Sequence, residues 1–296
     1  MTLLNKHKII LGTANFDQKY GILSKNKKIK KEEINKIFEF IYQKKITKLD
    51  TAYEYGNIHR LIGNYSNKNL KIYTKFPKIL SKKNIQKKTY QIIEKIFMDL
   101  KVLKLEAMYF HHPEQILSKE GEIIYSVINE LKKNKMIKKI GFSIYNPYEM
   151  IELKKNFDFD IIQAPLNIFD QRMIKKQWLE FTKNYNIQVV YRSIFLQGIL
   201  LNKIENLPKH FKQYRKILLV YQKWIEKNQI NNIYACISFI MKNLDKNEFI
   251  LGFRSRYELD QLFDTFKNIM KIDKKINFDK KLSCNEINLI DPRKWL

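Results

Sequence analysis

The stretch Leu49-Asp50-Thr51-Ala52-Tyr53-Glu54-Tyr55-Gly56 decides the fold, because it marks where a buried strand ends and a loop begins. Polar residues close three successive short apolar runs: Asp50 closes 46–49, Lys75 closes 70–74 and His111 closes 107–110. In a parallel barrel these strand ends converge on one face. Lys75 needs a carboxylate there, and Asp50 is the obvious partner, because neighbouring strands lie about 4.8 Å apart. We expect Tyr55 to lie beside Lys75, whose ammonium group would lower the phenol pKa and make Tyr55 a usable proton donor.

The rest of the chain alternates short apolar runs with longer amphipathic stretches. We interpret eight runs as strands: 9–11, 46–49, 70–74, 107–110, 137–141, 160–163, 187–191 and 248–252. The helices expected are 31–44, 57–65, 84–104, 121–135, 147–156, 173–185, 212–228 and 257–270, with 232–243 as an extra helix before the last strand. This alternation predicts an α/β protein folded as a closed (β/α)8 TIM barrel. We expect one domain over residues 1–296, with a tail, 274–296, packing over one end of the barrel.

Composition places the chain among ordinary folded proteins. With 296 residues, 45% of them hydrophobic, it can bury a large core. The segment from Met1 to Leu11 is too short and too interrupted by Lys6 and Lys8 for a signal peptide or a membrane helix. Only two cysteines are present, Cys236 and Cys284, and we interpret them as free structural thiols. These features predict a cytoplasmic protein that does not insert into a membrane.

The formal net charge of +26 invites a nucleic-acid partner, but the pattern argues against one. The excess is nearly all lysine, scattered through helices such as 82–104 rather than gathered with arginine and aromatic residues into one tract. A field of this sign still favours anionic ligands, such as phosphorylated cofactors.

Several motifs together resemble the aldo-keto reductase family, and the resemblance runs from Leu11 to about Leu262. In chain order they are Leu11-Gly12-Thr13-Ala14, Asp50 to Gly56, Lys75, His111-His112-Pro113, Ile140-Gly141-Phe142-Ser143, Ile162 to Asn167, Arg192 to Gly198 and Gly252-Phe253-Arg254-Ser255. Each motif alone is weak, but their joint order is specific. The stretch Tyr20-Gly21-Ile22 and the run Phe195 to Gly198 also resemble the branch often found with surface-polysaccharide biosynthesis.

The resemblance implies NAD(P)H-dependent reduction of a small carbonyl substrate. Tyr55 would protonate the carbonyl oxygen while nicotinamide delivers hydride to the carbon, and His111 would orient the carbonyl. Lys75, held by Asp50, would lower the phenol pKa. Each residue also has a structural reading: Asp50 could cap a turn, and His111 beside His112 could be purely structural. We predict no metal site, because adjacent histidines in a strand point to opposite faces and no acidic or cysteine cluster completes a ligand set.

The resemblance also implies the cofactor residues. Gly12 and Thr13 belong to the first-strand motif, while Ser143 and Gln163 resemble the pair that binds the nicotinamide carboxamide. Arg192 takes the place of a ring that stacks on nicotinamide, and a planar guanidinium can stack likewise. Backbone amides of 193–198, including Ser193, Gln197 and Gly198, would cradle the pyrophosphate. Arg254, Ser255 and Arg256, near the start of the last helix, would hold the 2′-phosphate of NADP.

Departures from the family pattern leave NAD possible as the cofactor. Glu258 is a carboxylate that would repel a 2′-phosphate, and His59 replaces a usual glutamate. They also keep open a second class of function, a nucleotide-binding sensor with little or no turnover. The intact set of Asp50, Tyr55, Lys75 and His111 favours the enzyme. Specificity in such barrels lies in variable loops and the tail, so the substrate is left open.

Overall fold

The structure, a computed structural model, describes residues 8–17, 29–65, 69–244, 246–271 and 276–295. Its strands are β1 (Ile9–Gly12), β2 (Lys48–Asp50), β3 (Lys71–Phe76), β4 (Leu105–Phe110), β5 (Ile137–Ser143), β6 (Ile161–Pro165), β7 (Gln188–Arg192) and β8 (Glu248–Gly252). All neighbouring pairs are parallel, and β1 pairs with both β2 and β8, which closes the barrel. The predicted (β/α)8 barrel is confirmed.

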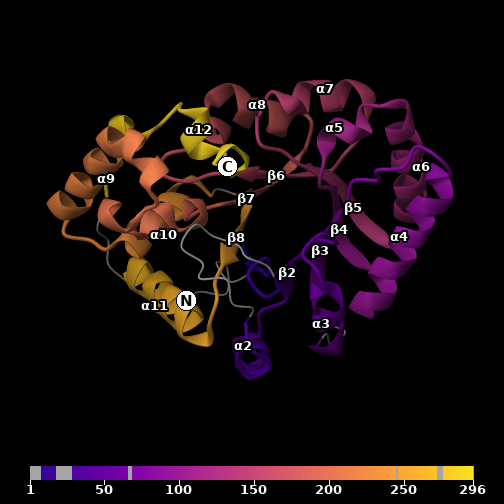
Figure 1. Cartoon of the computed structure of the whole chain (residues 1–296), viewed down its shortest axis with the longest axis horizontal. Coiled ribbons are helices and arrows are strands. Elements are labelled where there is room, and N and C mark those ends of the chain that lie inside the picture. The colour runs from indigo at the N-terminus through magenta and orange to yellow at the C-terminus, as the bar shows by residue number, and fades with distance from the viewer. Residues whose placement is uncertain (1–7, 18–28, 66–68, 245, 272–275, 296) are drawn as a thin grey trace.

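Helices follow the strands and lie outside them (Figure 1). The α-helices are α2 (Lys31–Gln43), α3 (Ile58–Tyr65), α4 (Ile85–Leu100), α5 (Pro113–Ile116), α6 (Lys119–Lys133), α7 (Glu149–Asn156), α8 (Lys176–Asn184), α9 (Arg215–Asn228), α10 (Asn232–Asn243), α11 (Arg256–Lys271) and α12 (Ile287–Ile290). Short 3-10 helices are η1 (Arg172–Ile174), η2 (Leu196–Leu201), η3 (Ile204–Asn206), η4 (Lys209–Tyr214), η5 (Lys280–Leu282) and η6 (Pro292–Lys294).

Local backbone geometry explains where the elements differ from expectation. The helix predicted over 84–104 ends at Leu100, because Lys101 takes a left-handed conformation with φ 54° and its N–H caps the last turn. The helix predicted over 212–228 begins as the 3-10 helix η4 and becomes α-helical only at Arg215. The short helices α5 and α12 carry too few residues for a periodic signal, and the sequence did not predict them.

Two hydrophobic cores support the barrel. Seven buried residues fill its interior: Ile10, Tyr73, Ala107, Tyr109, Ile161, Val190 and Ile250. A larger core lies between the outer faces of the strands and the surrounding helices. Because side chains alternate along a strand, the residue two positions beyond an interior residue also faces the barrel axis.

The C-terminal tail lies on the loops that follow β5 and β6. The Cys284 N–H donates to the Phe169 carbonyl at 2.8 Å, and the Arg293 guanidinium stacks on the Tyr145 ring. Both loops emerge from the carboxyl ends of the strands. Residues 20–22, which carried part of the branch resemblance, lie outside the described residues.

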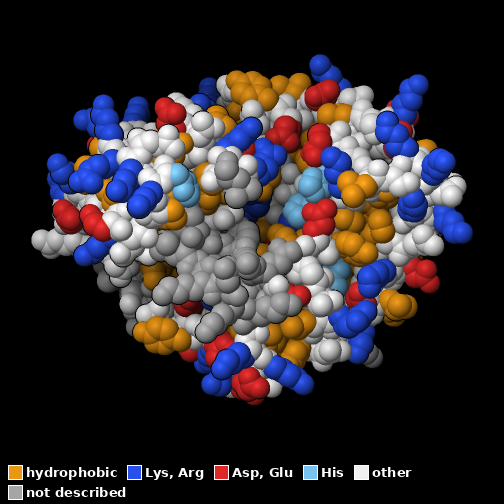
Figure 2. All heavy atoms as spheres, viewed as in Figure 1, with side chains coloured by type: hydrophobic (Ala, Val, Ile, Leu, Met, Phe, Trp, Pro, Cys, Tyr) orange, Lys and Arg blue, Asp and Glu red, His pale blue; other side chains and the backbone are white. Residues whose placement is uncertain are grey.

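Two further expectations concern membrane insertion and the distribution of the basic residues. Among the described residues, no helix combines the length and apolarity that crossing a bilayer requires. On the face seen in Figure 2, Lys and Arg side chains are spread around the molecule rather than gathered into one patch, and the centre of this face is hollowed.

Candidate active site

The predicted site residues meet because of the period of two along the strands. Lys75 follows the interior residue Tyr73 by two positions, and Gln163 follows Ile161 in the same way. Arg192 bears the same relation to Val190. These three side chains therefore face the axis at the carboxyl end of the barrel, where active sites of this fold lie. His111 directly follows the end of β4 and lies at the same end of the barrel, beside Tyr55.

A buried ion pair forms the floor of the site. Lys75 Nζ lies 2.7 Å from Asp50 Oδ1 and 2.9 Å from Oδ2, and it also donates to the Thr51 carbonyl at 3.0 Å. Lys75 is 1% exposed and Asp50 4% exposed. Gln163 Nε2 donates to Asp50 Oδ2 at 2.8 Å. The carboxylate thus receives the hydrogen bonds that a buried charge requires.

The loop after β2 places Tyr55 over this pair. The Thr51 and Tyr53 amides donate to carbonyls of β3, so the loop is fastened to the neighbouring strand. Gly56 then turns the chain toward α3 with φ 77°, a conformation that favours glycine. The Lys75 ammonium group consequently lies 5.2 Å from the centre of the Tyr55 ring.

The pKa of Tyr55 shifts in the direction opposite to the prediction, which was that Lys75 lowers it. Burial and the Asp50 carboxylate raise the pKa of Tyr55 above its ordinary value, while Arg192 acts in the opposite direction. Burial and the Asp50 carboxylate, which also neutralises the charge of the ammonium group, determine the direction of the shift. Tyr55 is therefore a protonated phenol at neutral pH.

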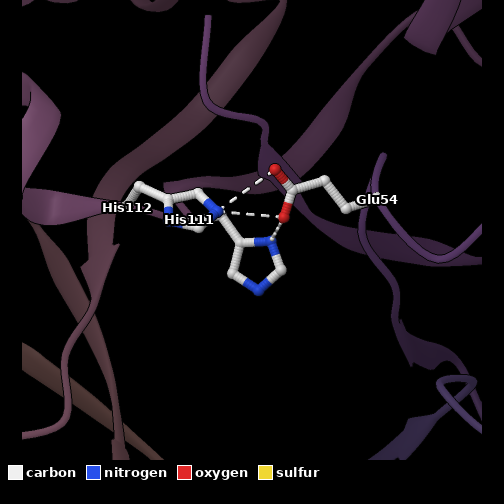
Figure 3. Close-up of side chains that lie close together, drawn as sticks. All are labelled: Glu54, His111 and His112. Atoms are coloured by element: carbon white, nitrogen blue, oxygen red, sulfur yellow. Dashed lines mark hydrogen bonds and ion pairs between the residues drawn. The ribbon is translucent and has the colours of Figure 1, made fainter. Parts of the chain in front are cut away.

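His111 lies beside Tyr55 and is also close to Glu54 and His112. The His111 and Tyr55 rings are 6.0 Å apart in an edge-to-face arrangement. His111 Nδ1 lies 2.8 Å from Glu54 Oε2, and His112 Nε2 lies 3.1 Å from the same carboxylate (Figure 3). Burial is the main reason why the pKa of His111 is lowered, whereas the hydrogen bond with Glu54 raises the pKa of His112.

His111 and His112 do not point to opposite faces, so that prediction is wrong. Strand β4 ends at Phe110, so both histidines lie beyond the strand, and the alternation of side chains no longer applies. Both imidazoles turn toward Glu54, which is one residue before Tyr55 in the sequence. The three side chains form the cluster shown in Figure 3.

A cavity of about 280 Å³ opens beside the predicted catalytic residues Asp50, Tyr55, Lys75 and His111. Nine predicted site residues line it: Gly12, Asp50, Tyr55, Gln163, Arg192, Ser193, Gln197, Gly198 and Arg254. Six others are not among its lining residues: Thr13, Lys75, His111, Ser143, Ser255 and Arg256. Lys75 lies buried under the cavity, and Thr13 holds the end of β2 by donating its hydroxyl to the Asp50 carbonyl at 2.9 Å.

The loop after β7 lines one wall of the cavity with unusual backbone geometry. Ser193, Leu196 and Gln197 have φ values of 60°, 45° and 50°, and Gly198 has φ 99°. Left-handed conformations at non-glycine residues are costly and concentrate at binding sites. Asn167 supports the loop by donating to the Ser193 carbonyl at 3.1 Å.

The start of α11 shows which of its predicted residues face the cavity. Ser255 Oγ accepts the Glu258 N–H at 3.1 Å, and Glu258 Oε2 accepts the Arg254 N–H at 2.7 Å, a pair of bonds that caps the helix. Arg254 and Glu258 line the cavity. The Arg256 guanidinium instead donates to Asp260 at 2.8 Å and stacks on Phe40, so the prediction that it lies at the cofactor site does not match its position.

The sequence missed three residues near the site. The Tyr145 ring lies between two guanidinium groups, with Arg192 Cζ 4.0 Å and Arg293 Cζ 3.6 Å from its centre. Asn15 lines the cavity and donates to the Phe253 carbonyl at 3.0 Å. Tyr145 and Arg293 carry no motif, and only tertiary structure brings them together. Asn15 directly follows the first-strand motif Leu11 to Ala14, and this position is the sequence signal that could have identified it.

The fold and the site define a barrel of the oxidoreductase type, with a buried lysine–aspartate pair under a tyrosine. The aldo/keto reductase family model matches residues 8–280, and the chain belongs to this family. No curated protein sequence matches the chain significantly.

Solved structures resemble the fold at low identity. An aldo-keto reductase from Bacillus halodurans, solved in its holo form, has a TM-score of 0.68 at 14% identity, over 88% of this chain and 86% of that one. A candidate aldo-keto reductase from Pseudomonas aeruginosa has a TM-score of 0.64 at 13% identity, over 89% of this chain and 90% of that one.

Proposed function

We propose that this protein reduces an aldehyde or ketone to an alcohol with NAD(P)H, using Tyr55 as the general acid. The observation that carries the proposal is the buried Asp50–Lys75 pair beneath Tyr55 at the wall of the cavity. A protein that only binds nucleotide has no need of a costly buried ion pair beneath a phenol.

In the proposed reaction, a nicotinamide held in the cavity would supply the hydride that the carbonyl carbon receives. Tyr55 gives its proton to the carbonyl oxygen as negative charge develops there, and Lys75 stabilises the phenolate that is left. A raised phenol pKa is compatible with this step, because a developing alkoxide is itself a strong base. His111, next to Tyr55, would orient the carbonyl.

The cavity residues support a nicotinamide nucleotide as the cofactor. Arg192 Nε is a buried donor that has no hydrogen-bond partner within the described residues, and Arg192 lines the cavity, so a polar ligand group there would satisfy it. The loop over 193–198, with its left-handed residues, would cradle the pyrophosphate through backbone amides. Ser143, buried at the end of β5, would join Gln163 at the carboxamide.

We further propose NADP(H) as the preferred form, held at its 2′-phosphate by Arg254. The Glu258 carboxylate is engaged with the Arg254 amide, and this use in capping reduces its effect on an anion. Equilibrium titration of NADPH and NADH decides the preference. Tighter binding of NADH would show that repulsion of the 2′-phosphate by Glu258 outweighs its attraction by Arg254. We place the reaction in the cytoplasm, since both cysteines are free and buried.

The test of the function is NADPH consumption over a panel of aldehydes, ketones and keto-sugars. Tyr55→Phe should lower turnover about a hundredfold or more while cofactor affinity stays nearly unchanged. Turnover confined to keto-sugars or nucleotide-linked sugars would support the association with surface-polysaccharide biosynthesis. Tight NADPH binding without turnover above the Tyr55→Phe background on every carbonyl would instead establish the sensor function.

A further inference from the structure

The cluster of Glu54, His111 and His112 has the composition of a transition-metal site. Its two imidazole nitrogens and one carboxylate oxygen all lie within 4.8 Å of one another. Histidine and carboxylate are the ligands that Zn²⁺ takes in sites with three protein ligands and an open fourth position. We propose that these three side chains bind a divalent transition-metal ion, with Zn²⁺ as the reference ion.

The spacing of the donor atoms fits a tetrahedral ion. Glu54 Oε2 lies 2.8 Å from His111 Nδ1 and 3.1 Å from His112 Nε2. Ligands about 2.0 to 2.1 Å from zinc in a tetrahedron lie roughly 3.3 Å from one another. The cluster therefore needs to open by only a few tenths of an ångström at each of these two contacts to admit the ion.

The hydrogen bonding of His111 leaves its metal-facing nitrogen available. Nδ1 is buried, and despite its 2.8 Å approach to Glu54 it has no partner in hydrogen-bond geometry among the described residues. An ion at Nδ1 would satisfy this atom. It would also confine the imidazole proton to Nε2, which points away from Glu54 in Figure 3.

Groups around the cluster resemble the outer shell of metal sites. Glu114 Oε1 lies 3.3 Å from His112 Nδ1, the ring nitrogen opposite the one that faces Glu54. Metal-bound histidines commonly donate their other N–H to a carboxylate in this way. The Lys78 amide donates to Glu54 Oε1 at 3.2 Å and so helps to hold the carboxylate. Oε2 lies near both histidines, and Oε1 lies 3.1 Å from His112 Nε2 as well.

An ion can also reach the cluster from solvent. The side chains of Glu54 and His112 are 34% and 35% exposed, and that of His111 is 21% exposed. The site is therefore open enough for exchange, and its ligands still belong to a structured strand end, since the His111 amide donates to the Phe76 carbonyl at 3.1 Å.

The test is calorimetric titration of the purified full-length protein with Zn²⁺, together with Co²⁺ absorption as a report of the ligand geometry. We expect one saturable site, weakened at least tenfold by Glu54→Gln and by His112→Gln. Glu114→Gln should weaken binding about tenfold through His112. His210→Gln, at an exposed histidine on η4, is the matched control and should bind like the wild type.

A measurement on the unmodified protein guards against variants that fold poorly. In long-range ¹H–¹⁵N spectra of the histidine rings, Zn²⁺ should shift Nδ1 of His111 and Nε2 of His112 and leave His59 unchanged. The proposal is overturned if Zn²⁺ does not bind at millimolar concentration, or if binding persists unchanged in Glu54→Gln and His112→Gln. None of these readouts requires turnover, so they are independent of the proposed reduction.

Discussion

Replacing Lys75 by methionine should destabilise the protein strongly, because it leaves a charge buried. The Asp50 residue is 4% exposed, and without Lys75 its carboxylate keeps a hydrogen bond of 2.8 Å from the Gln163 amide. Removing one partner of a buried ion pair costs about 3 to 5 kcal/mol. We expect Lys75→Met to lower the free energy of unfolding by that amount.

The double variant Asp50→Asn/Lys75→Met separates this effect from a general loss of packing. It has no buried charge at either position, and methionine fills most of the lysine stem volume. We therefore expect it to be more stable than Lys75→Met alone, with a coupling free energy between the two changes of about 2 kcal/mol or more.

Urea unfolding followed by tryptophan fluorescence measures all four corners of this cycle. Lys95→Met is a matched control, since Lys95 pairs with Asp99 at 2.8 Å on an exposed helix surface with 46% of its side chain accessible. That pair should contribute less than about 1 kcal/mol. The reasoning is refuted if Lys75→Met costs no more than Lys95→Met, or if the double variant loses the sum of the two single losses.

Three other residues give sharp expectations. Burial lowers the pKa of His59 from 6.5 to about 4, so the unfolded chain binds its proton first, and stability should fall by about 2 kcal/mol between pH 7.5 and pH 5. Urea unfolding at both pH values should show this part of the loss in the wild type and not in His59→Gln. Arg254→Met should weaken NADPH binding at least tenfold and NADH binding little, whereas Arg256→Met should change neither; equal losses in fluorescence titrations would contradict the assignment. Arg172→Met should cost about 3 kcal/mol in urea unfolding, because it strips a buried carboxylate, Asp170, of two hydrogen bonds of 2.8 and 2.7 Å; a loss below 1 kcal/mol would contradict this.

The fold was predictable because its determinants are local. Each of the eight strands overlaps one of the short apolar runs, and each predicted helix has apolar residues three and four positions apart. Apart from the short helices α5 and α12, the errors lie at the ends of elements, where one residue such as Lys101 stops a helix by adopting a left-handed conformation. Such a stop depends on tertiary packing more than on composition.

The site was predictable only in part, for a physical reason. The pairing of Asp50 with Lys75 follows from strand order and from the cost of burying a lone charge. The raised pKa of Tyr55 depends on burial, which no motif encodes. The approach of Glu54 to His111 and His112 depends on where β4 ends, and one residue of difference in that end reverses the direction of a side chain.

The stack of Arg192, Tyr145 and Arg293 connects the C-terminal tail to the cavity in which we propose that the nucleotide binds. Arg192 lines that cavity, while Arg293 belongs to η6 in the tail, and a single aromatic ring contacts both guanidinium groups. Thermodynamic linkage makes such coupling reciprocal. If docking of the tail changes the affinity for nucleotide by some factor, then nucleotide binding must change the docking equilibrium of the tail by the same factor. If the cavity holds the proposed cofactor, we therefore expect removal of the tail around Arg293 to change the affinity for that cofactor.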